Sequence, residues 1–315
     1  MRPSRKALDP RQPGGWLVEN ERAVDGRLIG SLTAFLTNRE CPWRCVFCDL
    51  WQFALDREVK PGDVPDQLRA VLEQHARSGG VASQIKLFNA GSFFDSRAIP
   101  ASDDPVMADL VGGFERVVVE SHPALVGSRC WRFRDGLLKA SGGRARLEVA
   151  MGLETANPEV LARLNKRVTL SGFRQAASAL RREGVDLRVF VLVRPPFEDP
   201  TAAGEWVAKS VACAFEAGAT VVSLIPVRSG NGALEALRAQ GLFHPPSFDD
   251  LESALDSALA LGGGRVFADL WDLERFRSCG DCFAARRARL ERMNLTQCAE
   301  PRVRCDACGA GEAVR

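Results

Sequence analysis

Three cysteines close together in the first part of the chain offer the most specific chemistry in this sequence. Cys41, Cys45 and Cys48 follow a C-x-x-x-C-x-x-C spacing, which lets three thiolates of one loop hold three corners of a cubane iron–sulfur cluster. A cubane normally takes a fourth cysteine, but the next one along the chain is Cys130. One iron would therefore keep a position open for a small molecule. This arrangement suits the reduction of a sulfonium such as S-adenosylmethionine, with release of a carbon radical.

Two other uses of the three thiols stay open. A structural zinc site needs four ligands, so Asp49 would have to supply the fourth. A disulfide with one spare thiol fits poorly with a chain that shows no secretory feature. Phe47, directly before the last cysteine, favours the cluster because its flat ring suits an adenine.

Composition sets the broad class of the protein. The 315 residues are 46% apolar, which suits one large α/β domain of about 250 residues with an appendage. The net charge of +2 excludes neither nucleic acid nor anionic metabolites. No apolar run follows the charged start of the chain or reaches the length of a membrane span. Ten cysteines then indicate metal ligation in a reducing cytoplasm rather than disulfides.

Apolar and amphipathic segments alternate after residue 25, which is preceded by an irregular lead-in rich in Pro, Gly and Arg. The expected strands are 28–36, 85–88, 116–119, 147–151, 187–193 and 220–226. The expected helices include 64–78, 158–164, 171–183 and 201–217. This order predicts a parallel sheet with right-handed crossovers. Its pattern fits either a curved six-stranded partial (β/α) barrel or a flat doubly wound sheet.

Polar loops would meet at one edge of that sheet, because ligand-binding residues of parallel α/β folds lie at the carboxyl ends of the strands. The loops expected there are the cysteine loop, 89–95, 120–123, 152–155 and 194–197. We therefore expect one site at this edge, although Asn, Gly and Glu are also common in ordinary turns.

Other reactive side chains receive simpler interpretations. His75 is expected to be a packed core histidine, and Cys130 and Cys213 to be buried thiols. Asp95 is expected to solvate its loop. His122 is left open between a role in a turn and a contact with substrate.

Together these motifs resemble the radical S-adenosylmethionine superfamily over residues 25 to 270. The likeness is to the branch that holds the Elongator catalytic subunit and the radical subunit of archaeosine synthase. The matching segments are the cysteine triad with Phe47, Ala90–Phe93, Glu120–Pro123, Gly152–Thr155, Asn165–Lys166 and Arg194–Phe197.

The resemblance implies a fold and an activity. The fold would be the partial barrel. A 4Fe–4S cluster would cleave S-adenosylmethionine to methionine and a 5′-deoxyadenosyl radical, which abstracts hydrogen from the substrate. An electron donor such as flavodoxin or ferredoxin is implied, and a base in tRNA is the first choice of substrate. A peptide or small metabolite is the alternative.

The resemblance also implies roles for single residues. The expected contacts of S-adenosylmethionine are Phe47, Asn89, Gly91, Ser92, Glu120, Glu154, Lys166 and Arg194. Glu120 and Glu154 match positions at the ribose and the methionine, and a carboxylate can accept hydrogen bonds from two ribose hydroxyls. Lys166 matches a position at the methionine carboxylate, with Arg167 as an alternative. Asn-Ala-Gly-Ser replaces the Gly-Gly-Glu of other members, so the partner of the ammonium group stays open.

Two C-x-x-C pairs near the carboxyl terminus predict a second metal site. Cys279/Cys282 and Cys305/Cys308 are separated by 22 residues, which is typical of zinc ligands. Cys298 lies between the pairs and keeps an auxiliary iron–sulfur cluster open. We therefore expect a lead-in over 1–25, a partial-barrel domain over 26–272 and a cysteine-rich module over 273–315.

A run of arginines between these pairs could bind phosphate. Arg286, Arg289 and Arg292 would share one face of a helix as a basic stripe, or form an ordinary solvated surface. The stripe also keeps open a function of another class, a non-catalytic nucleic-acid-binding protein with structural metals.

Overall fold

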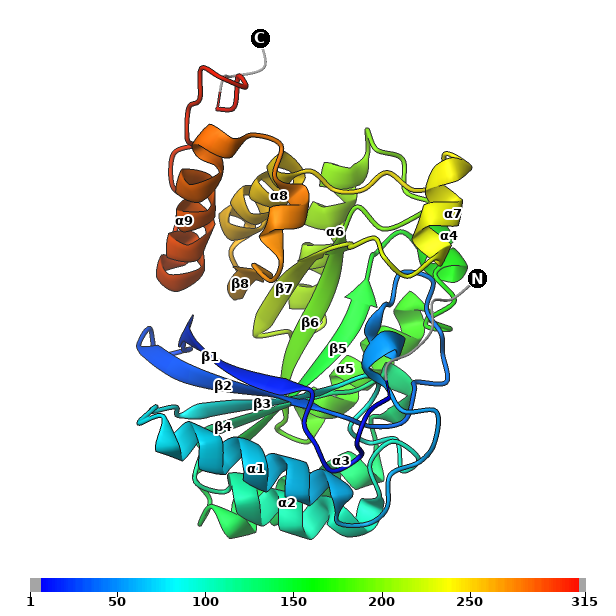
Figure 1. The fold of residues 1–315 in the computed structure, drawn as a ribbon, viewed down its shortest axis with the longest axis vertical. Helices are drawn as coiled ribbons and strands as arrows, with labels where there is room; N and C mark the ends of the chain where they lie inside the picture. Colours follow the sequence, from blue (N-terminus) through cyan, green and yellow to red (C-terminus); the bar gives the residue numbers. More distant parts are fainter. Residues whose placement is uncertain (1–6, 312–315) are drawn as a thin grey trace.

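A computed structural model describes residues 7–311 as one open sheet wrapped by helices (Figure 1). The strands follow one another in chain order, β1 to β8. Neighbours from β2 to β8 are parallel, and β1 is antiparallel to β2. The strands are β1 (Gly15–Arg22), β2 (Leu28–Leu36), β3 (Gln84–Asn89), β4 (Arg116–Glu120), β5 (Arg146–Glu154), β6 (Asp186–Val193), β7 (Val221–Pro226) and β8 (Arg265–Ala268).

The prediction of six strands is corrected to eight. The six expected strands are β2 to β7, each within three residues of its predicted ends. β1 lies where an irregular lead-in was expected, so that prediction is wrong over Gly15–Arg22; residues 1–6 lie outside the described part. β8 has only four residues and follows three glycines, which hid it in the sequence.

The sheet is curved into a partial barrel rather than flat. In a flat sheet β1 and β6 would lie about 24 Å apart, five strand spacings. Instead Arg188 on β6 forms a buried ion pair with Glu21 on β1. Arg265 on β8 also donates to the carbonyl of Arg22, at 2.8 Å. The two outer strands are thus drawn together at one end of the barrel.

Nine helices are described in residues 7–311, and most lie along the outside of the sheet (Figure 1). They are α1 (Asp63–Arg77), α2 (Asp104–Val111), α3 (Ser128–Ala140), α4 (Pro158–Arg163), α5 (Leu170–Arg182), α6 (Ala203–Glu216), α7 (Ala233–Ala239), α8 (Phe248–Leu261) and α9 (Gly280–Thr296). Within this part of the chain, none of them combines the length and apolar character that a membrane crossing requires.

Side chains of each strand alternate between the helices and the barrel interior. On β6, Val189 and Val191 belong to the main apolar core, whereas Arg188 faces the interior. There Arg188 also contacts Glu148 at 2.6 Å, and Lys86 contacts Glu21 at 2.5 Å. Burial alone would raise the pKa of Glu21, but the charges of Arg188 and Lys86 hold it well below its usual range. This charged network, the barrel floor, closes the end opposite the strands' carboxyl ends.

Candidate active site

The cysteine loop leaves the carboxyl end of β2, the first of the parallel strands. Cys41, Cys45 and Cys48 are all partly buried, and they lie close enough for their charges to interact. Burial raises the pKa of Cys41, and the backbone N–H groups of Trp43 and Arg44 counteract part of this rise. Burial raises the pKa of both Cys45 and Cys48 to about 12. A metal bound here must therefore displace their protons.

Two asparagines from distant loops hold the cysteine loop in place. The Asn165 side-chain amide donates to the carbonyls of Trp43 and Arg44, both at 3.1 Å. The Asn231 amide donates to the carbonyls of Val46 and Cys48, at 2.8 and 3.3 Å. Sequence reasoning missed Asn231. Its signal was its place in a Gly-Asn-Gly turn, Gly230–Gly232, after β7.

An ion pair lies buried behind the loop. Lys166 contacts Glu154 through a short hydrogen bond. Burial would lower the pKa of Lys166, but the charges of Glu154 and Cys45 outweigh it and raise that pKa. Gly152 makes room for the pair, since an added Cβ would lie 1.9 Å from the Glu154 carboxylate and 2.3 Å from the Lys166 nitrogen.

Glu120 and Asn89 lie together at the ends of β4 and β3. The Glu120 carboxylate accepts the backbone N–H of Asn89 at 3.0 Å, and burial raises the Glu120 pKa to about 7. The Asn89 side chain is 5% exposed, and neither of its polar atoms has a hydrogen-bond partner in the described chain. Gly91 lies against the cysteine loop, because a Cβ added to it would be 3.5 Å from that of Cys41. A ligand with donors and acceptors would satisfy Asn89, so these residues fit S-adenosylmethionine beside a cluster.

His122 has a packing role. Its ring stacks on Trp43, with centroids 3.8 Å apart. Nδ1 accepts from the N–H of Ala124, and Nε2 donates to the carbonyl of Lys166. Burial lowers the pKa of His122 to about 4, so the ring is neutral. Both nitrogens are used within the protein, which favours the turn interpretation over a substrate contact.

The other expected residues lie around this centre. Ser92 accepts the backbone N–H of His122 at 2.8 Å. Phe47 packs against an apolar cluster that includes Leu161 and Leu234. Arg194 turns away toward α8, where its Nε lies 3.5 Å from Asp250.

Three of the simpler interpretations agree with the structure. His75 is buried on α1, with its ring edge against Trp16. Cys130 and Cys213 are buried in the core. Asp95 accepts the N–H of Arg97 within its loop.

Glu198 is a residue that sequence reasoning missed. It follows Phe197 in the loop after β6, and burial raises its pKa to about 8 although Arg194 lies near. One of its carboxylate oxygens is buried without a hydrogen-bond partner in the described residues. The preceding Pro195-Pro196 pair marks this loop as rigid, which was the available signal.

A charged cavity of about 690 Å³ opens beside Cys41. Its lining residues are Arg39, Glu40, Cys41, Pro42, Arg44, Asp56, Asp95, Arg97 and Arg167. Arg39 and Arg97 both contact Glu58, at 2.5 and 3.3 Å. Arg167 is exposed and forms no ion pair within residues 7–311.

Comparison with known proteins finds similar sequences and similar folds. No model of a protein family matches the chain. Archaeosine synthase subunit beta of Methanosarcina acetivorans is 26% identical over 231 residues, which are 71% of this chain. The chain spans only 65% of the length of that relative.

Two solved structures share the fold. Methylornithine synthase (PylB) matches 84% of this chain and 69% of its own, with a TM-score of 0.53 and 14% identity. Elp3 of Methanocaldococcus infernus matches 75% and 56%, with a TM-score of 0.52 and 16% identity. In the present chain the cysteine loop lies at the carboxyl end of the first parallel strand of this fold. The chain is thus similar in sequence to archaeosine synthase subunit beta and shares its fold with methylornithine synthase and Elp3.

The chain also carries a second cysteine group. The sulfurs of Cys279, Cys282, Cys305 and Cys308, which we term the four-cysteine group, all lie within 4.8 Å of one another. The sequence prediction that these residues come together is confirmed. Cys298 is exposed and lies apart from the group.

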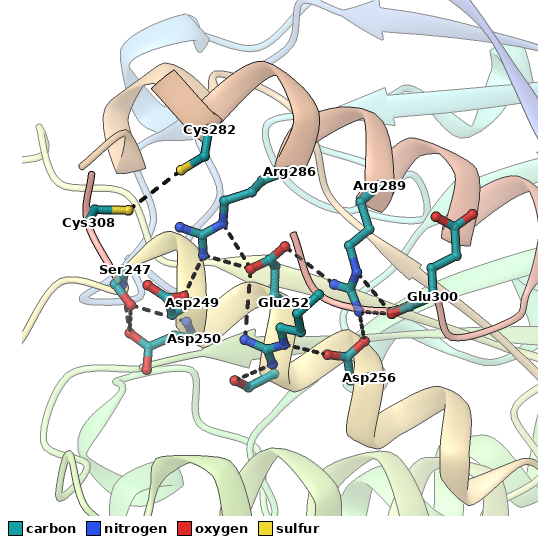
Figure 2. Close-up of polar contacts among 12 residues, drawn as sticks. Ser247, Asp249, Asp250, Glu252, Asp256, Cys282, Arg286, Arg289, Glu300 and Cys308 are labelled. Carbon is teal, nitrogen blue, oxygen red and sulfur yellow. Dashed lines mark hydrogen bonds and ion pairs between the residues drawn. The ribbon is translucent and has the colours of Figure 1, made fainter. Parts of the chain in front are cut away.

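The predicted basic stripe is not available to nucleic acid. Arg286 and Arg289 are 3% and 1% exposed, and both contact Glu252 on α8 (Figure 2). Arg292 is exposed but pairs with Glu300 at 2.8 Å. The prediction that these arginines lie on one helix, α9, is confirmed. The face that carries Arg286 and Arg289 is buried, because it packs against acidic residues of α8.

Proposed function

We propose that this chain is a radical S-adenosylmethionine enzyme whose Cys41, Cys45 and Cys48 hold a 4Fe–4S cluster. The observation that carries the proposal is the placement of three clustered thiols on the rim, with the other seven cysteines elsewhere. Those seven lie in the core, in the four-cysteine group or, for Cys298, after α9. One iron would thus lack a protein ligand.

The cluster and S-adenosylmethionine together supply a 5′-deoxyadenosyl radical that removes hydrogen from the substrate. The chain's own residues bind and orient the ligands. Asn89 offers a donor and an acceptor next to Cys41, and Glu120 suits a ribose hydroxyl. Glu154 and Lys166 fix the wall behind them, with Phe47 beside the cluster. The barrel floor excludes water from the interior, and electrons would come from a donor such as flavodoxin or ferredoxin.

A base in tRNA is our proposed substrate. The support is the relative named archaeosine synthase and the charged cavity beside Cys41, where Arg167 has no acidic partner within residues 7–311. The arginines of α9 no longer support it, because two of them are buried. A peptide or small metabolite is the second candidate, and the size of the cavity suits either.

Anaerobic reconstitution tests the activity. Protein with four irons, treated with dithionite and S-adenosylmethionine, should release methionine and 5′-deoxyadenosine even without substrate. Cys45→Ala should abolish the release, whereas Cys298→Ala should keep it because Cys298 lies outside both cysteine groups. Loaded wild-type protein that produces no 5′-deoxyadenosine would refute the enzymatic proposal and favour a non-catalytic protein.

The substrate class needs a separate assay. Unmodified tRNA transcripts should bind at low salt and be released by about 200 mM salt, since phosphate contacts are sensitive to salt. Arg167→Gln should weaken this binding, because it removes a cation of the cavity that forms no ion pair within residues 7–311. Binding that is equally strong at both salt concentrations, or absent at low salt, would remove tRNA from the proposal.

A further inference from the structure

The spacing of the sulfurs in the four-cysteine group distinguishes between kinds of metal site. The Cys279–Cys305 and Cys282–Cys308 sulfurs lie 4.0 and 3.7 Å apart. A disulfide bond is about 2.05 Å long, so neither pair is bonded. Zinc with four sulfurs at about 2.3 Å gives tetrahedral edges of about 3.8 Å, close to both distances.

An auxiliary cubane fits this group poorly. A cubane puts each cysteine on a different iron, so its ligand sulfurs stand farther apart than four sulfurs on one ion. In the described residues the thiols of Cys41, Cys45 and Cys48 do not form so compact a group. The contrast between the two cysteine sets indicates a single metal ion at the four-cysteine group.

Each half of the four-cysteine group, Cys279/Cys282 and Cys305/Cys308, has a backbone conformation that suits a pair of metal ligands. Cys279 is the N-cap residue of α9, so its side chain lies at the N-terminus of this helix. In the second half, the backbone N–H of Gly309 donates to the carbonyl of Cys305 at 2.8 Å, which closes a tight turn. Gly309 there has φ +69°, a left-handed conformation that suits glycine. A helix N-terminus stabilises a thiolate, which is the form that binds metal.

A guanidinium lies between this group and the barrel. Arg286 follows Cys282 by one turn of α9, and its side chain lies beside that cysteine (Figure 2). The same side chain contacts Glu252 at 2.6 Å and Asp249 at 2.5 Å, both on α8 (Figure 2). Four thiolates on a divalent ion carry two net negative charges. Arg286 offsets part of that charge while α8 holds it in position.

Further contacts extend the link along α8. Arg289 binds Asp256 and the carbonyl of Glu300, both at 2.5 Å (Figure 2). Arg302 binds Asp256 at 3.0 Å. The segment between the two halves of the four-cysteine group is therefore fixed to one acidic face of α8. In turn α9 packs on β1 and β8, the two outer strands of the sheet (Figure 1).

We propose that the four-cysteine group binds one zinc ion with a structural role, and that Arg286 is the positioning residue that couples this ion to α8. Zinc thereby fastens α9 across the two outer strands. This inference does not depend on the proposed radical chemistry, because the four-cysteine group and Arg286 share no residue with the cysteine loop.

Metal analysis of the anaerobically purified full chain tests the metal. We expect one zinc per chain in addition to the irons of the cluster. Cys282→Ser should lose the zinc and keep the iron, whereas Cys298→Ser should keep both. Cobalt added in place of zinc should show the intense thiolate charge-transfer bands of a tetrahedral site. Eight irons without zinc, or zinc retained by Cys282→Ser, would overturn the proposal. If Cys282→Ser does not fold, zinc content and the cobalt spectrum of the wild type decide.

The role of Arg286 needs its own comparison. Arg286→Gln should lower the affinity for zinc 10–100-fold, measured by competition with a chromophoric chelator. It should also make α9 more accessible to protease in the presence of zinc. Arg287→Gln is the matched control, since Arg287 lies on the same helix and pairs with Glu274 and Glu291 near the surface. Equal zinc affinity in the two variants would refute the coupling.

Discussion

Glu120 makes the stability of the cluster-free protein depend on pH. Burial raises its pKa from 4.5 to about 7. Between these values the folded chain holds a proton that the unfolded chain has released. The stability contributed by this proton is complete at low pH and is lost as the pH rises through 7. The difference amounts to at most about 3 kcal/mol, since one pKa unit is about 1.4 kcal/mol. Because Glu120 is partly exposed, we expect about 2 kcal/mol.

Glu120→Gln removes the titration and keeps an oxygen that can accept the N–H of Asn89. Relative to wild type, the variant should therefore gain about 2 kcal/mol between about pH 4.5 and pH 8. Urea unfolding at several pH values measures this difference. Glu115→Gln is the control, because Glu115 is exposed and should change stability by less than about 0.5 kcal/mol. A Glu120→Gln curve that runs parallel to wild type across the whole range would refute the reasoning.

Three further substitutions test the packing around the site. Gly152→Ala should cost about 2 kcal/mol of unfolding free energy, because its methyl overlaps the buried ion pair; an unchanged urea midpoint would contradict this. Asn231→Ala should cost about 1–2 kcal/mol and speed hydrogen exchange in the cysteine loop, since it removes two loop contacts and the cap of α7. Exchange no faster than in wild type would count against that role. Arg188→Met should cost about 3–5 kcal/mol at neutral pH, because Glu21 and Glu148 each lose one of their two cationic partners. The loss should shrink in acid, where those carboxylates take up protons, and thermal melts at both pH values will show whether it does.

Much of the barrel followed from local patterns. β2 to β7 are apolar runs whose alternation with helices needs no long-range information, and their predicted ends are close to the observed ones. β1 was not predicted because its second half, Glu19–Arg22, is polar or charged, and its strand character comes from pairing with β2. Glu21 shows why: its partner Arg188 lies 167 residues away.

The sequence predicted which residues form the candidate site, but it did not predict which of them contact one another. The cysteine spacing is local, and the loops that follow the strands converge by topology. The ion pair of Glu154 and Lys166 depends on the left-handed backbone at Glu154, φ +68°, and on the absence of a side chain at Gly152. The burial of Arg286 and Arg289 could have been predicted from the acidic residues of α8. Asp249, Glu252 and Asp256 repeat at intervals of three and four residues, so α8 carries an acidic stripe that matches the arginines.

The barrel floor has a mechanical consequence. Backbone ladders join every neighbouring pair from β1 to β8, but the ring is completed at its base by side chains such as Arg188 and Arg265. The barrel wall is therefore continuous in its backbone hydrogen bonds from β1 to β8, and within residues 7–311 only side-chain contacts close the gap between β8 and β1. If the barrel widened at the carboxyl ends of its strands to admit a bulky ligand, side-chain contacts would be disturbed but the backbone hydrogen bonds between strands would stay intact.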